Sequence, residues 1–172
     1  MKKVQSKYII IAWFIIVLLI LTPFPSRFSL SLCGYEVGEG GCSTTDTSMK
    51  GVLWKLNYLF LQDKIKGKIV VRQGKSEKTV IGMNDPIHKL DDKVSISSTL
   101  YYDREENGHV GFIMWFNSDF DKIFTATTKN NRAYVWCDKL DEVQNVYDFF
   151  EDNINSYFIR EEPTAYFREP SL

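Results

Sequence analysis

The segment HVGFIMWFN, residues 109–117, decides the architecture that this sequence predicts. Successive side chains of a β-strand point to opposite faces of the sheet. One face of this segment would carry Val110, Phe112, Met114 and Phe116, and the other face Ile113 and Trp115. A strand that is apolar on both faces is normally covered on both faces. We therefore expect this segment to be a central strand with a packed layer on either side.

Alternating apolar and polar residues, interrupted by turn signals, recur on both sides of this strand. We expect further strands over residues 51–61, 65–72, 77–81, 94–102, 123–128 and 132–137. Short hairpin turns join most of them, which makes the sheet antiparallel. The two apolar faces of the central strand favour a curved sheet or barrel over a flat sandwich, although periodicity does not report whether a sheet closes.

After residue 137 the apolar spacing changes from two residues to three or four, which indicates a helix. The apolar stripe consists of Leu140, Val143, Tyr147, Phe150, Ile154 and Tyr157. This spacing predicts one amphipathic helix over residues 138–157, with Asp138 capping its first turn. We expect the helix to lie on the sheet or to cover one end of it.

The N-terminal segment YIIIAWFIIVLLILTPFPS, residues 8–26, contains no charged residue and follows three lysines. At about 1.5 Å per residue, a helix of this length reaches about 28 Å, close to a bilayer core of about 30 Å. The segment therefore predicts a transmembrane helix, and the lysines favour a cytoplasmic N-terminus. A cleaved signal peptide is the alternative, with Ser29-Leu30-Ser31 as a candidate cleavage site. Both interpretations place the remaining residues outside the cytoplasm.

These expectations divide the chain into four parts and give an α+β fold class, an antiparallel β-meander between an N-terminal transmembrane helix and a C-terminal amphipathic helix. The parts are a cytoplasmic N-terminus (1–7), a transmembrane anchor (8–26), a Gly/Ser/Thr-rich connector (27–50) and an extracytoplasmic β-rich domain (51–172). The expected localisation is a bacterial inner membrane, crossed once, with the domain in the periplasm.

Composition and motifs favour a protein without catalytic activity. The chain has 172 residues and a net charge of −1, and no basic patch suggests nucleic acid. No motif of a serine hydrolase, dinucleotide site, P-loop or zinc protease occurs. Two histidines without a CxxC pair predict no metal site, and no cofactor is expected. An envelope hydrolase that uses Cys137 or His109 remains the alternative.

Three cysteines, Cys33, Cys42 and Cys137, are candidates for a disulfide in an oxidising compartment. All three pairings remain open, because spacing alone does not select among them. Cys33 with Cys42 would close a short glycine-rich loop, whereas either one with Cys137 would tie the connector to a late strand.

A surplus of aromatic and sulfur-containing side chains falls on two of the expected strands. We interpret these residues either as ordinary core or as the lining of an interior that accepts a small apolar ligand. The candidate ligand-binding residues are Phe112, Met114, Trp115, Phe116, Tyr134 and Trp136.

The arrangement of the chain resembles the FidL-like and ToxS-type periplasmic proteins. The shared features are the lysine-flanked apolar segment 8–21, the early Cys33, the hairpin over residues 65–81 and the total length. The resemblance implies a lipocalin-like domain that pairs with a single-pass transcription regulator and senses an amphipathic ligand. It carries over no functional residue.

The predicted function is that of a non-catalytic, membrane-anchored extracytoplasmic protein. It would bind a membrane protein partner, such as a regulator, and a small apolar molecule. The alternative is an accessory or structural subunit of an envelope assembly of the secretion, pilus or toxin-immunity kind.

Overall fold

The computed structural model describes residues 2–38, 41–74, 77–103, 107–128 and 132–159. Helix α1 (Lys2–Leu21) precedes nine strands, and three short helical segments follow them. The strands are β1 (Phe24–Gly38), β2 (Gly41–Asn57), β3 (Lys64–Gln73), β4 (Glu77–Pro86), β5 (His88–Lys89), β6 (Ser95–Asp103), β7 (Gly108–Phe116), β8 (Ile123–Thr127) and β9 (Ala133–Cys137). The helical segments are η1 (Leu140–Glu142), α2 (Val143–Phe149) and α3 (Glu151–Ile159).

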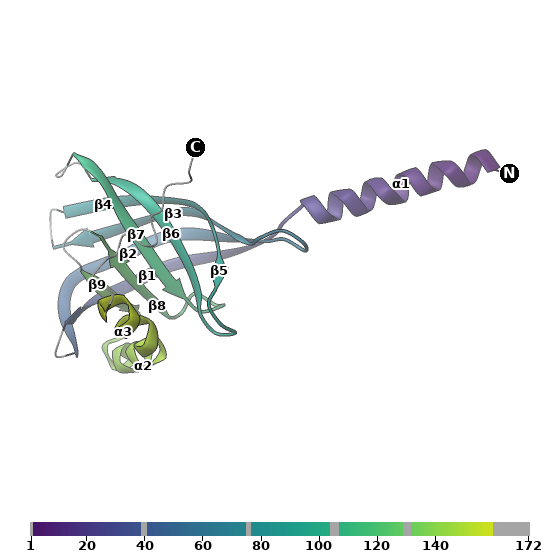
Figure 1. The fold of residues 1–172 in the computed structure, drawn as a ribbon. Helices are drawn as coiled ribbons and strands as arrows, with labels where there is room; N and C mark the ends of the chain where they lie inside the picture. The colour runs from purple at the N-terminus through teal and green to yellow at the C-terminus, as the bar shows by residue number, and fades with distance from the viewer. Residues whose placement is uncertain (1, 39–40, 75–76, 104–106, 129–131, 160–172) are drawn as a thin grey trace.

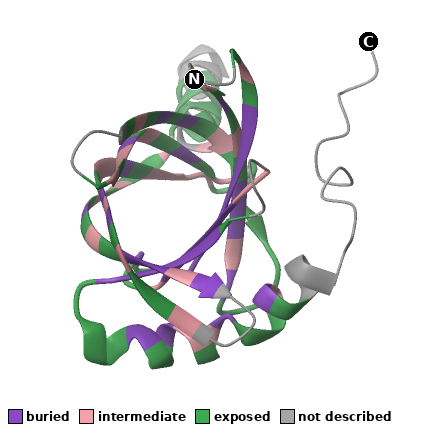
Figure 2. Cartoon of the chain, turned by 90° about the vertical axis from the view of Figure 1, so that its left-hand side faces the viewer, coloured by how far each residue is buried: buried purple, intermediate pink, exposed green. Residues whose placement is uncertain are grey.

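All nine strands belong to one antiparallel sheet in the order β4-β3-β2-β1-β9-β8-β7-β6-β5. The sheet is curled, so that β4 comes to lie beside β6 (Figure 2). A hydrogen bond from Thr99 Oγ1 to the carbonyl oxygen of Gly82, 3.4 Å long, joins these two strands. The expectation of a β-rich, antiparallel architecture is thereby confirmed.

The curled sheet separates two hydrophobic clusters, and β7 contributes to both of them. Phe112, Met114 and Phe116 belong to the cluster enclosed by the sheet. Ile113 and Trp115 belong to the second cluster, on the opposite face, where α2 packs on β8 and β9. Full burial of such side chains stabilises a fold by about 1.5–3 kcal/mol each. The prediction that this strand is covered on both faces is confirmed.

The predicted single C-terminal helix is wrong, because the chain forms η1, α2 and α3 instead. The break falls at Phe150, whose φ of −105° and ψ of 9° are not helical. Phe150 is fully buried and lies 4.8 Å from the ring of Phe149 and 6.3 Å from that of Phe124. Packing against β8 therefore overrides the helical periodicity at this position. Asp138 does not cap the first turn, since the N-cap residue of η1 is Lys139.

The N-terminal prediction also needs correction. In the portion of the chain that the structure describes, no helix combines the length and the apolar character needed to cross a bilayer. The predicted transmembrane anchor over residues 8–26 is therefore wrong, and with it the predicted fold class and the single-pass inner-membrane localisation. The helix ends at Leu21 and β1 begins at Phe24, because Pro23 lacks the amide hydrogen that would continue the helix. Figure 1 shows α1 projecting away from the sheet.

The predicted irregular connector, residues 27–50, instead lies almost entirely in the long hairpin of β1 and β2. Its register shifts between Gly34 and Tyr35, where β2 has extra residues. Gly34 itself lies against Trp136, and an added Cβ would stand 2.8 Å from the indole ring. Glycine is thus required here by the close approach of a large, buried ring.

We predict that Gly34→Ala lowers the free energy of unfolding by about 1–3 kcal/mol, because the Trp136 ring must move to admit the methyl group. Gly82→Ala is the matched control, since an added Cβ there meets nothing within 4 Å. The control should change stability by about 0.5 kcal/mol or less in urea denaturation. Equal stability losses in the two variants would contradict the proposed contact.

Candidate functional site

Five of the six predicted ligand-binding residues lie together in the enclosed cluster, and Trp115 does not. The five are Phe112, Met114, Phe116, Tyr134 and Trp136. Trp115 lies on the other face, 4.9 Å from the ring of Phe124. All six side chains are buried, with at most 4% of their surface exposed. In this structure these residues are packed core, and a ligand would have to displace them to enter.

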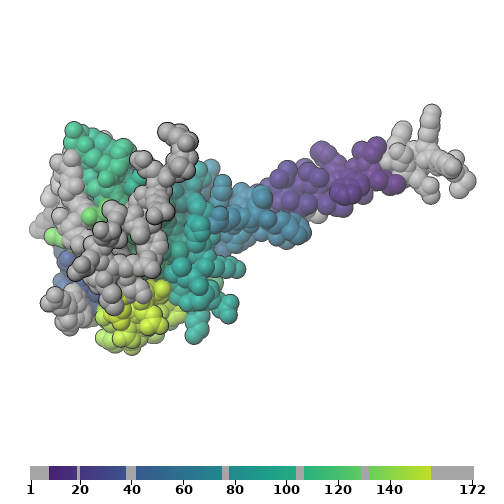
Figure 3. Space-filling model, viewed as in Figure 1, coloured from purple at the N-terminus to yellow at the C-terminus, as the bar shows by residue number. Residues whose placement is uncertain are grey.

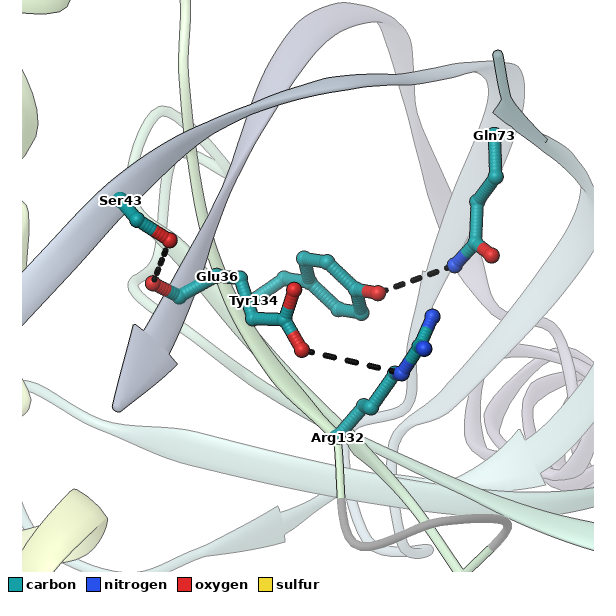
Figure 4. Close-up of polar contacts among 5 residues, drawn as sticks. All are labelled: Glu36, Ser43, Gln73, Arg132 and Tyr134. Atoms are coloured by element: carbon teal, nitrogen blue, oxygen red, sulfur yellow. Dashed lines mark hydrogen bonds and ion pairs between the residues drawn. The ribbon is translucent and has the colours of Figure 1, made fainter. Parts of the chain in front are cut away.

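Polar groups in this interior are held by neighbours from other strands. Trp136 Nε1 donates a 2.7 Å hydrogen bond to Thr125 Oγ1, and Gln73 Nε2 donates one of 3.0 Å to the Tyr134 hydroxyl (Figure 4). Ser97, opposite Met114 in the register of β6 and β7, is fully buried. Its Oγ has no hydrogen-bond partner among the described residues.

The three cysteines are free thiols, so the predicted disulfide is not formed. Cys33 of β1 and Cys137 of β9 are direct partners in the register of these two strands. Cys42 of β2 lies opposite Val37 of β1. Burial, together with the nearby carboxylate of Glu142, raises the pKa of Cys137 to about 11. Burial also raises the pKa of Cys42. A thiol held in the neutral form is a poor nucleophile, so this environment does not favour the hydrolase alternative.

The two histidines lie on β5 and β7, whereas the three thiols lie on β1, β2 and β9. His88 Nδ1 is 3.2 Å from Gln62 Nε2, and His109 makes an edge contact with the ring of Tyr102. The described residues contain no group of three side chains that could hold a metal ion. Residues 117–122 form a turn in which Asn117 Oδ1 accepts a hydrogen bond from the Lys122 amide.

The feature that sequence reasoning missed is a split in the sheet between β1 and β9. β1 pairs with β2 from Phe24 to Gly38 but with β9 only from Cys33 to Glu36. The edge of β1 before Cys33 therefore has no strand partner on the β9 side among the described residues. The glycine, serine and threonine content of residues 27–50 favours a loop. This content obscured the period-2 alternation of Phe28, Leu30 and Leu32 with Ser29 and Ser31, which is the signal that could have identified the strand.

An open groove of about 700 Å³ lies along this edge. Residues 29–32 of β1 form one wall, the turn before β8 forms another, and the segment from β9 to α2 completes it. Its charged lining residues are Asp119, Asp121, Asp138 and Glu142 against Lys122 and Lys139. Four carboxylates against two lysines leave two negative charges. Lys122 Nζ is engaged within the wall, 3.4 Å from Asn145 Oδ1 and over the ring of Phe149.

Phe120 closes the groove toward the enclosed cluster. Its φ of 58° is left-handed, which is costly for a residue with a side chain. The ring is nevertheless buried. It stacks on Phe116 at 4.4 Å and lies 4.5 Å from the tilted ring of Phe28 of β1. These contacts stabilise the turn and hold it beneath the split. The groove is thus closed on its inner side by a residue of the packed core.

The second exposed feature of the described chain is α1. Each residue from Tyr8 to Leu18 is exposed, and α1 projects away from the sheet (Figure 3). Ile9, Ile10 and Ile11 expose 57%, 65% and 54% of their surface, and Trp13 and Phe14 expose 64% and 68%. Consecutive positions are about 100° apart round a helix, so the apolar surface encircles α1.

Comparison with known proteins adds no assignment. No family model, no curated protein and no solved structure matches this chain.

We predict that Cys137 makes the native state less stable as the pH rises from about 9 to about 11. The unfolded thiol ionises near its ordinary pKa of 9.0, whereas the folded thiol keeps its proton until about 11. Between pH 9 and pH 11, deprotonation of this thiol therefore lowers the free energy of the unfolded state and not that of the folded state. Urea denaturation should show a stability difference between the wild type and Cys137→Ala that shrinks as the pH rises. A difference that stays constant from pH 9 to pH 11 would show that burial does not perturb Cys137.

Proposed function

We propose that this chain is a non-catalytic binding protein that attaches to a protein partner through α1. The supporting observation is the exposure of apolar side chains on every side of this helix. A helix that is apolar all round is buried in its working state.

The partner we propose is a protein that surrounds α1 with several apolar helices. A second copy of the chain, packed along one stripe of α1, would leave the opposite stripe exposed. Ile9, Ile10 and Ile11 point in three directions, so covering all three needs neighbours on several sides. The membrane protein partner expected from the sequence meets this requirement. A subunit of a larger envelope assembly is the second candidate, since an assembly also supplies several neighbours.

Photo-crosslinking in cells tests this proposal. A photoreactive amino acid replaces Ile9, Ile10 or Ile11 in turn, and Tyr102, which exposes 53% of its surface on the sheet, is the control position. We expect all three α1 positions to form an adduct with the same partner protein and the control position to form none with it.

Two results would contradict the proposal. Adducts from only one of the three positions would show that a single stripe is covered. Adducts with a second copy of this chain alone would show that α1 mediates self-association.

A further inference from the structure

The free edge of β1 carries backbone groups that are ready to pair with another strand. The carbonyl oxygens of Phe24, Gly34 and Glu36 accept hydrogen bonds from β2 side chains, namely Asn57, Thr45 and Ser43. Backbone groups of successive residues in a strand point to opposite neighbours. Odd-numbered residues of β1 therefore direct their N–H and C=O groups away from β2.

Two of these odd-numbered residues, Ser29 and Ser31, lie where β9 no longer runs alongside. Both are exposed and line the groove. Among the described residues, no backbone hydrogen bond outside the strand ladders involves either of them, and the only ladder at these positions is that with β2. Unpaired edges of this kind are sites where an extended segment of another chain adds a strand.

The groove determines the chemistry of the added segment. Its floor is Phe120, and Leu30 and Leu32 turn their side chains toward the enclosed cluster, so the groove side of β1 offers mainly backbone. The far wall carries Asp138 and Glu142, and the turn carries Asp119 and Asp121. Backbone pairing on one side and carboxylates on the other suit an extended segment with basic side chains.

We propose that the groove between β1 and the β9–α2 segment binds an extended, basic peptide segment of a partner protein, which pairs with Ser29 and Ser31 as an added antiparallel or parallel strand. This site is separate from α1 and does not depend on the function proposed for that helix. A peptide bound here would pair with the part of β1 that lies beyond the end of β9 and would so extend the sheet.

The variant that tests the backbone pairing is Ser31→Pro. Proline removes the groove-side N–H of residue 31 and leaves the ladder with β2 intact, and edge positions of a sheet tolerate it. Ser31→Ala is the matched control, because it removes the same hydroxyl and keeps the N–H. Asp138→Asn with Glu142→Gln, made together, removes two charges without changing the backbone.

The probe is a fluorescein-labelled peptide of four Lys-Val repeats, titrated against the full-length chain in non-ionic detergent and followed by anisotropy. We expect saturable binding that weakens as salt is added, because the attraction is partly between exposed charges. Ser31→Pro should weaken it at least tenfold, Ser31→Ala should leave it unchanged, and the double charge variant should weaken it. A Glu-Val repeat peptide should not bind.

The proposal fails if the Lys-Val peptide shows no saturable binding, or if Ser31→Pro binds it as tightly as Ser31→Ala does. It also fails if the edge is occupied by a second copy, which would appear as a dimer that Ser31→Pro converts to monomer. Should Ser31→Pro not fold, the double charge variant decides, and unchanged binding there overturns the proposal.

Discussion

The fold depends on a short seam of four residue pairs between β1 and β9. The order of the sheet places β4-β3-β2-β1 on one side of this seam and β9-β8-β7-β6-β5 on the other. Among the described residues, the strand pairing that joins the two halves is the ladder from Cys33–Cys137 to Glu36–Tyr134. Beneath the seam, Trp136 lies against Gly34, and above one end an ion pair joins Arg132 Nε to Glu36 Oε1 at 3.7 Å. Because exposed ion pairs contribute little, about 0–1 kcal/mol, the buried indole and the backbone pairing carry this junction.

The length of the seam explains the other unusual features of the molecule. β1 has fifteen residues and β9 has five, so most of β1 continues after its neighbour has ended. The sheet must open at that point, and the turn with Phe120 fills the inner side of the opening. The outer side remains as the acidic groove. The difference in length between β1 and β9 therefore exposes the edge of β1 and also creates the groove beside it.

Local signals explain which elements could be predicted from the sequence. The β3–β4, β6–β7 and β8–β9 hairpins follow from alternating side chains and polar turns, since both are encoded within a few residues. The β1–β2 hairpin was missed, because its glycine, serine and threonine content favours a loop and outweighed the alternation of Leu30 and Leu32 with Ser29 and Ser31. Its glycines have another cause, since Gly34 and Gly51 are required by close approach to Trp136 and to β3. The break at Phe150 depends on burial against Phe124, which no helical periodicity reports. The groove was missed for the same reason. Because β1 was not expected to be a strand, its free edge was not expected either.

Residue-resolved hydrogen exchange of the full-length chain tests the open edge of β1 most directly. The account predicts that the amides of Ser29 and Ser31 exchange rapidly, whereas those of Leu30 and Leu32, which face β2, are protected together with Cys33 and Tyr35 in the seam. Equal protection of Ser29, Leu30, Ser31 and Leu32 would show that this stretch of β1 is paired on both sides. The split, the groove and the peptide site would then all be contradicted.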